Sequence, residues 1–190
     1  FGEPVDLEEA GYLQPMAATF AGKQVIDAFV NAIRPSIIEE QAPQIVTPAR
    51  SLYTTPPFPW SRPVYEAGKS VFNLQACDNE FERTFARFLD KADDCRAMAK
   101  LPRDCGFAIE YADVAGNLRL YYPDFVAVDE AGGHWLIETK GQEDLNVSLK
   151  DRAAELWCRN ATGLSGAKWM YVKVRQKDFE AFEPTLIAQL

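Results

Sequence analysis

Hydrophobic and polar positions follow a strand-like pattern in four segments of the second half of the chain. These segments are "FAIEYADV" (107–114), "LRLYYPDFVAVD" (118–129), "HWLIETK" (134–140) and "KWMYVKV" (168–174). Each is rich in aromatic or β-branched residues, and turn-forming residues separate the first three. We therefore predict four strands, and we predict that the second and third form a hairpin.

Helical spacing of apolar residues marks three further segments. Residues 78–90 ("DNEFERTFARFLD") repeat a large apolar residue at helical intervals, which predicts an amphipathic helix. A second helix is predicted over 145–163, with Gly163 as its stop, and a short third helix over 176–182. The order of helix, three strands, helix and strand predicts an α/β fold with a mixed four-stranded sheet flanked by helices.

The first 76 residues have a different character. A helical repeat of apolar residues predicts a helix over about 22–34, and a proline-rich connector follows over 43–63. We predict an N-terminal helical and extended extension over residues 1–76 and one α/β domain over 77–190. Because the chain begins with Phe1 rather than Met, we expect it to be part of a longer polypeptide.

The predicted hairpin carries three charged residues among apolar neighbours. If its turn is centred on Ala131, Asp124 lies opposite Glu138. Lys140 shares the face of Glu138, because side chains alternate along a strand. Both faces of the hairpin are otherwise apolar, which predicts a central hairpin covered on both sides.

Opposed carboxylates inside a sheet destabilise the fold unless a positive charge compensates them. A divalent cation between Asp124 and Glu138 would do so, and hard oxygen ligands with open positions suit Mg²⁺. Lys140 would then orient or deprotonate a water molecule, or neutralise a phosphate, which points to metal-assisted hydrolysis of a phosphodiester. The alternative is a plain ion pair of Asp124 with Lys140, with Glu138 facing solvent.

The amino-acid composition limits the classes of function that this protein can have. The 190 residues carry a formal net charge of −8, which argues against binding nucleic acid by bulk positive charge alone. Metal-binding carboxylates add negative charge themselves, so a nucleic-acid enzyme is not excluded. The sequence contains no apolar run long enough to span a bilayer and no CxxC pair among its four cysteines. We expect a cytoplasmic protein with reduced thiols.

Two motifs of the hairpin resemble the signature of the PD-(D/E)xK nuclease superfamily. They are "YPDF" (122–125) and "IETKG" (137–141). The predicted element order resembles the restriction-endonuclease-like αβββαβ core of that superfamily over about residues 78–175. Together with "NEFERTFARFLD" and "KDRAAELWC", these motifs are similar to the C-terminal endonuclease domain of the restriction (Res) subunit of type III restriction enzymes.

The resemblance implies roles for individual residues. Asp124 would be the main metal ligand, Glu138 the second carboxylate and the carbonyl of Thr139 a further ligand, with Mg²⁺ as cofactor and Mn²⁺ as a substitute. Lys140 would act on the attacking water or on the charge of the transition state. Lys150 and Arg152 would be candidates for contacts to DNA phosphates, and a solvated helix face is the alternative explanation for both.

Many members of the superfamily also use a glutamate from the first helix. Glu80 and Glu82 are the candidates here, and the spacing of Glu82 to Phe85 fits the resemblance better. The alternative explanation for Glu82 is a capping box with Asn79.

The resemblance also implies partners. They are double-stranded DNA as substrate, a helicase motor N-terminal to this segment in the same polypeptide, and a separate modification (methyltransferase) subunit. Two other functions stay open: a PD-(D/E)xK nuclease of a DNA repair or recombination system, and a non-catalytic DNA- or protein-binding module on the same fold.

Overall fold

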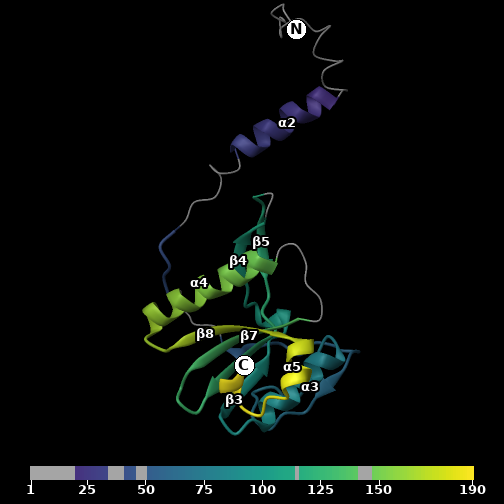
Figure 1. The fold of residues 1–190 in the computed structure, drawn as a ribbon, viewed down its shortest axis with the longest axis vertical. Coiled ribbons are helices and arrows are strands. Elements are labelled where there is room, and N and C mark those ends of the chain that lie inside the picture. Colours follow the sequence, from purple (N-terminus) through teal and green to yellow (C-terminus); the bar gives the residue numbers. More distant parts are fainter. Residues whose placement is uncertain (1–19, 34–40, 46–50, 114–115, 141–146) are drawn as a thin grey trace, which may run out of the picture. The chain divides into compact units, whose positions relative to one another are not determined.

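The structure is a computed structural model (Figure 1). It describes residues 20–33, 41–45, 51–113, 116–140 and 147–190. Contacts divide the chain into two parts, residues 1–42 with 114–117, and residues 43–113 with 118–190. The first part contains the helix α2 (Phe20–Ile33), close to its predicted position. No helix in the described part of the chain is long and apolar enough to cross a membrane.

The second part is built on a four-stranded mixed sheet in the order β3-β6-β7-β8. Its strands are β3 (Cys95–Lys100), β6 (Phe125–Asp129), β7 (His134–Lys140) and β8 (Trp169–Arg175). The first three are antiparallel neighbours, and β8 runs parallel to β7. The predicted α/β class with a mixed four-stranded sheet is therefore confirmed.

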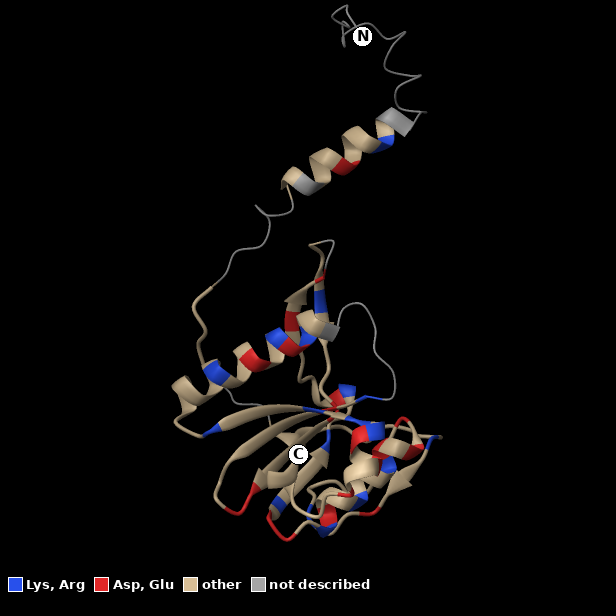
Figure 2. Ribbon diagram, viewed as in Figure 1, with Lys and Arg blue, Asp and Glu red and all other residues tan. Residues whose placement is uncertain are grey.

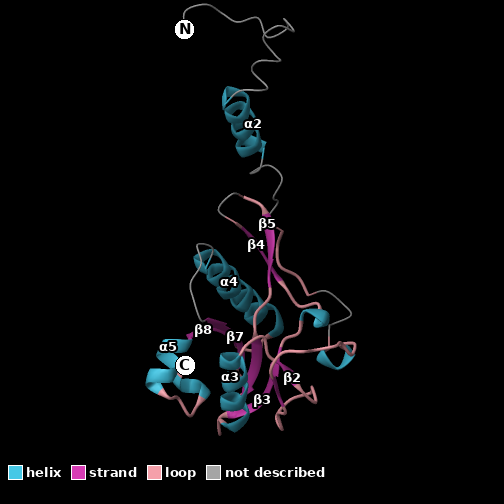
Figure 3. Cartoon of the chain, turned by 90° about the vertical axis from the view of Figure 1, so that its right-hand side faces the viewer, coloured by secondary structure: helices cyan, strands magenta, loops and turns pink. Residues whose placement is uncertain are grey.

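Helices cover both faces of this sheet, as Figures 1 and 3 show. On one face lie α3 (Glu80–Lys91) and α5 (Gln176–Phe182), and on the other lies α4 (Val147–Ser165), which connects β7 to β8.

The predicted stop of α4 at Gly163 is wrong. The helix continues to Ser165, and the chain leaves it at Gly166, whose φ of 73° is accessible to glycine without strain. Three short 3-10 helices are also described, at Leu52–Thr54, Arg103–Cys105 and Ile187–Gln189.

The sequence prediction of the first sheet strand is wrong. The segment 107–114 provides β4 (Ile109–Ala112), which pairs with β5 (Leu118–Tyr121) in a separate two-stranded sheet. The predicted strand 118–129 is split between β5 and β6, because Pro123 lacks an N–H for a ladder bond. The sheet uses β3 instead, whose sequence "CRAMAK" is poor in residues that favour strands.

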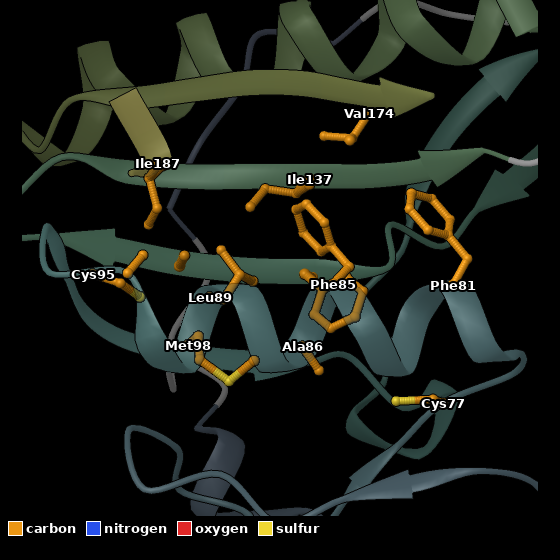
Figure 4. Close-up of a cluster of buried hydrophobic side chains, with 13 residues drawn as sticks. Cys77, Phe81, Phe85, Ala86, Leu89, Cys95, Met98, Ile137, Val174 and Ile187 are labelled. Atoms are coloured by element: carbon orange, nitrogen blue, oxygen red, sulfur yellow. The ribbon is translucent and has the colours of Figure 1, made fainter. Parts of the chain in front are cut away.

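Two hydrophobic clusters fix the hairpin between the helix layers. Phe85 of α3 packs with Phe125 and Ile137 on one face of the sheet. Figure 4 shows Phe85 and Ile137 in this cluster. On the other face, Leu136 packs with Ala154 of α4. Successive side chains of β7 therefore enter opposite clusters, and the hairpin is covered on both sides, as predicted.

Part of the predicted N-terminal extension is hydrogen-bonded to the sheet domain. Its strands β1 (Val64–Tyr65) and β2 (Gln75–Ala76) form an antiparallel pair. The buried side chain of Gln75 accepts a hydrogen bond from the N–H of Lys100 (2.9 Å), and the N–H of Met98 donates to the carbonyl of Lys69 (2.9 Å). This segment thus lies beside β3, and the division after residue 76 stays a prediction.

Candidate active site

The predicted register of the hairpin is confirmed. Phe125 pairs with Ile137, and the N–H of Asp124 donates to the carbonyl of Ile137 (3.1 Å). Asp124 and Glu138 therefore occupy opposing positions where β6 begins and β7 ends. A shift of one residue would move every apolar side chain to the wrong face, so the two hydrophobic clusters stabilise this register.

A buried lysine outside the hairpin lies between two of the predicted carboxylates. The Nζ atom of Lys100 lies 2.8 Å from Oδ1 of Asp124 and 3.1 Å from Oε2 of Glu82, and the lysine side chain is only 5 % exposed. Burial by itself would lower the pKa of Lys100. The charges of Asp124 and Glu82 outweigh that effect and raise the pKa to about 12, so the ammonium stays charged.

Of the two helix glutamates, only Glu82 points into this cluster. Glu82 is 5 % exposed, and its carboxylate accepts a hydrogen bond from the N–H of Asp78 (2.8 Å). The Glu80 side chain is 67 % exposed and pairs with Arg83. Asn79 caps α3 by accepting the N–H of Glu82 (2.9 Å), and its side-chain amide donates to Oε1 of Glu82 (3.2 Å). The backbone N–H that the Glu82 carboxylate accepts is that of Asp78 and not that of Asn79, so the capping box is incomplete.

Both carboxylate oxygens of Asp124 accept hydrogen bonds. Its Oδ2 accepts hydrogen bonds from the N–H and from the hydroxyl of Thr139, each 2.7 Å long, while Oδ1 receives the Lys100 ammonium. A carboxylate offers about four lone-pair positions, so these three bonds leave room for one further ligand. Thr139, expected as a carbonyl ligand, thus also positions Asp124 through its N–H and side chain.

The hydrogen-bond donor to Glu138 lies on the side of the sheet that α4 covers. Its Oε2 accepts a hydrogen bond from the hydroxyl of Tyr121 (2.9 Å), which belongs to the cluster beneath α4. Burial, followed by the negative charge of Asp124, raises the pKa of Glu138 to about 8, although Tyr121, Lys140 and Lys100 act in the opposite direction. Burial also raises the pKa of the Tyr121 hydroxyl, which therefore remains a donor.

Strand alternation predicts that the side chains of Asp124, Glu138 and Lys140 form a cluster on one face of the hairpin. The hydrogen bonds in the structure differ from this prediction. Asp124 precedes β6, and its carboxylate receives bonds from Lys100 and Thr139, while Glu138 is bonded by Tyr121. The charges of Asp124 and Glu138 nevertheless interact, and so do those of Glu138 and the half-buried Lys140. The carboxylates therefore form one electrostatic unit with separate hydrogen-bond partners.

Among the described residues of this site, the three carboxylates of Glu82, Asp124 and Glu138 share two ammonium groups, those of Lys100 and Lys140. Burial raises the pKa of Glu82 as well as that of Glu138, and the charge of Asp124 adds to both shifts. A divalent cation ligated by Asp124 and Glu138 would relieve this excess of negative charge, and the hard oxygen donors suit Mg²⁺. Among the described residues, no three acidic, histidine or cysteine side chains form a ready-made metal centre. Two carboxylates and the Thr139 carbonyl would make an incomplete shell, with positions left for water and phosphate.

The two predicted DNA-contact residues lie near the start of α4. Lys150 is half-buried and Arg152 is exposed. Between them, Asp151 accepts a hydrogen bond from the hydroxyl of Tyr171 (2.7 Å) and forms an ion pair with Lys173 of β8. Figure 2 shows basic and acidic residues mixed along α4, which is typical of a solvated face. Contact of Lys150 and Arg152 with DNA stays a prediction.

No protein family, curated protein or solved structure matches this chain.

Proposed function

We propose that residues 77–190 form a Mg²⁺-dependent DNA endonuclease domain on a restriction-endonuclease-like fold, the cleavage module of a type III restriction enzyme Res subunit. One observation carries the proposal. Asp124 before β6 lies opposite Glu138 of β7, and it shares the ammonium of Lys100 with Glu82 of α3 at one end of the mixed sheet. Residues 122–125 and 137–140, from the two motifs that resemble the PD-(D/E)xK signature, lie at this end of the sheet.

The residues have separate tasks in this proposal. Asp124 and Glu138, with the carbonyl of Thr139, would hold the ion, which when bound supplies Lewis-acid stabilisation of charge on the phosphate. Lys100, itself paired with Glu82, holds Asp124 in place. Water attacks the phosphorus in line with the 3′ oxygen and gives up a proton to the solvent, while the P–O3′ bond breaks and the 3′ oxygen takes up a proton from the solvent. Lys140 orients the water or neutralises the phosphate during this displacement.

The partners in this proposal follow from the resemblance. The substrate is double-stranded DNA, a helicase motor lies N-terminal in the same polypeptide, and a modification subunit supplies sequence recognition. A net charge of −8 argues against binding DNA by bulk positive charge alone, so other parts of the longer polypeptide would supply further phosphate contacts. Lys150 and Arg152 are the proposed contacts within the domain.

Nicking of supercoiled plasmid DNA tests the proposal. We expect wild-type protein to nick in Mg²⁺ and not in EDTA, and Lys140→Ala to lose nicking while keeping the wild-type circular dichroism spectrum. Lys177→Ala, which removes an exposed lysine from α5, is the matched control and should nick normally. Wild-type activity in Lys140→Ala would refute the role of Lys140, and metal-independent nicking would refute the mechanism.

One observation favours a second function, a non-catalytic DNA- or protein-binding module. Lys100 already supplies a buried positive charge to Asp124 and Glu82 without a metal ion. In that case the carboxylates have a structural role. Such a module would bind neither Mg²⁺ nor Mn²⁺ in calorimetry and would not nick DNA, whereas the endonuclease would do both.

A further inference from the structure

A groove lies next to Lys100, between β3 and the segment that precedes α3. Its volume is about 490 Å³, within the usual range of small-ligand sites. Its lining includes Thr55, Phe58, Trp60, Leu74, Lys100 and Pro102. All of these residues belong to the part of the chain that contains the sheet.

One of the aromatic residues that line this groove, Trp60, has its indole ring hydrogen-bonded to the backbone. The Nε1–H of Trp60 lies within hydrogen-bond distance of the carbonyls of Cys77 (3.2 Å) and Pro63 (3.3 Å), yet the residue remains 39 % exposed. The ring of Phe58 meets that of Trp60 edge to face, with centroids 6.0 Å apart. An exposed ring that is already immobilised loses little conformational entropy when a planar ligand stacks on it.

An arginine side chain lies beside the Trp60 ring. The guanidinium of Arg62, 59 % exposed, lies 5.4 Å from the centre of that ring and pairs with Asp78. An aromatic ring beside an arginine is a usual platform for an unpaired nucleic-acid base with its phosphate.

Lys100 connects this groove to the candidate active site. It lines the groove, and its ammonium lies 2.8 Å from Asp124. A base in the groove would therefore belong to a nucleotide close to the phosphate at the carboxylates.

We propose that this groove binds an unpaired nucleobase, so that the endonuclease acts on a strand that is locally single-stranded. The inference rests on the proposed function, because it concerns the substrate of the same site. In a duplex, the neighbouring bases cover both faces of each base. A ring in the wall of a groove can therefore stack only on a base that has left the duplex, as happens in a strand displaced by a helicase.

Fluorescence anisotropy with a labelled oligothymidylate, in EDTA and at one fixed salt concentration, tests the groove without cleavage. We expect wild-type protein to bind this strand more tightly than a duplex of equal length. Trp60→Ala should weaken single-strand binding about 5- to 150-fold, the equivalent of about 1–3 kcal/mol of stacking. Trp60→Phe should retain most of the affinity, because it keeps a ring. Phe182→Ala, which removes a 66 % exposed ring outside the groove, is the matched control and should not change binding.

Phe58→Ala provides a second test of the groove if Trp60→Ala fails to fold. The inference is overturned if the wild type does not bind the oligothymidylate, or if Phe58→Ala and every folded Trp60 variant bind it as tightly as the wild type. If the wild type nicks DNA but these variants bind the oligothymidylate normally, the groove proposal fails and the endonuclease proposal stands. If the variants bind it more weakly but the wild type does not nick DNA, the endonuclease proposal fails and the groove proposal stands.

Discussion

Lys100 and Asp124 form a buried ion pair between neighbouring strands, with Nζ and Oδ1 2.8 Å apart. Lys100 ends β3 opposite Phe125, so its side chain reaches the residue that precedes β6. Glu82 of α3 shares the same ammonium at 3.1 Å. The pair therefore joins α3, β3 and β6 at the place where the candidate active site lies.

Replacement of Lys100 by methionine should destabilise the protein strongly in the absence of metal. Asp124 and Glu82 would lose their shared cation, and leaving buried charges unpaired costs about 3–5 kcal/mol. Urea denaturation in EDTA measures this loss. Arg83→Ala is the control, because it breaks an exposed ion pair with Glu80 and should cost less than about 1 kcal/mol.

Mg²⁺ should restore part of the stability lost in Lys100→Met, since a divalent cation can take over the neutralisation of Asp124. The same denaturation with Mg²⁺ in place of EDTA provides the comparison. An equal loss under both conditions would speak against a metal site at these carboxylates.

Glu138 should make the fold less stable as the pH rises. Burial and the Asp124 charge raise the pKa of Glu138 from 4.5 to about 8 in the folded protein, so the folded state holds this proton more tightly than the unfolded chain does. The resulting stabilisation is fully present below about pH 4.5 and is lost as the pH rises through about 8.

Glu138→Gln, which cannot ionise, should remove this pH dependence. Relative to the variant, the free energy of unfolding of the wild type should fall by roughly 2–5 kcal/mol between acidic and alkaline pH. Urea denaturation in EDTA across this range measures the difference, and Glu180→Gln on the exposed side of α5 is the control. Parallel pH profiles of wild type and Glu138→Gln would show that Glu138 is not perturbed.

Asp124→Asn should weaken the binding of Mg²⁺ and Mn²⁺, because an amide oxygen is a poorer ligand than a carboxylate for hard cations. We expect a loss of at least about tenfold in isothermal titration calorimetry. Asp178→Asn removes an exposed carboxylate from α5 and should bind metal as the wild type does. Unchanged affinity in Asp124→Asn would exclude Asp124 as a ligand.

Glu82→Gln and Glu80→Gln form a matched pair on one helix. Glu82 touches Lys100 beside Asp124, whereas Glu80 lies at the surface with Arg83. We expect Glu82→Gln to reduce nicking about 10- to 100-fold, as for residues that orient a metal ligand, and Glu80→Gln to have little effect. Wild-type activity in both variants would mean that α3 contributes no functional carboxylate.

The β6–β7 hairpin is the part of the fold that local sequence predicts best. Its alternating apolar residues and its glycine-containing turn set the strand period and the position of the turn, and these fix the opposition of Asp124 and Glu138. The same holds for α3, whose apolar face and Asn79 cap are both local features. Residues close in sequence decide these elements, so their pattern is sufficient.

The sequence pattern fails at β3 and at Lys100 for one reason. "CRAMAK" has weak strand propensity, and it becomes a sheet strand because it pairs with β6. Lys100 contacts a carboxylate 24 positions away, and a lysine at the end of an unrecognised strand carries no signal of that contact. A lysine followed closely by Pro102 after a short apolar run is the only local hint.

The sequence by itself determined the α/β class, the hairpin register and the residue types that can bind a cation. Only the tertiary structure decided which strand begins the sheet, that Glu82 rather than Glu80 is buried, and that Lys100 and Tyr121 hold the two hairpin carboxylates. Local periodicity reports which side of a strand or helix is apolar. Partners distant in sequence meet only when the layers pack, and no local pattern records that packing.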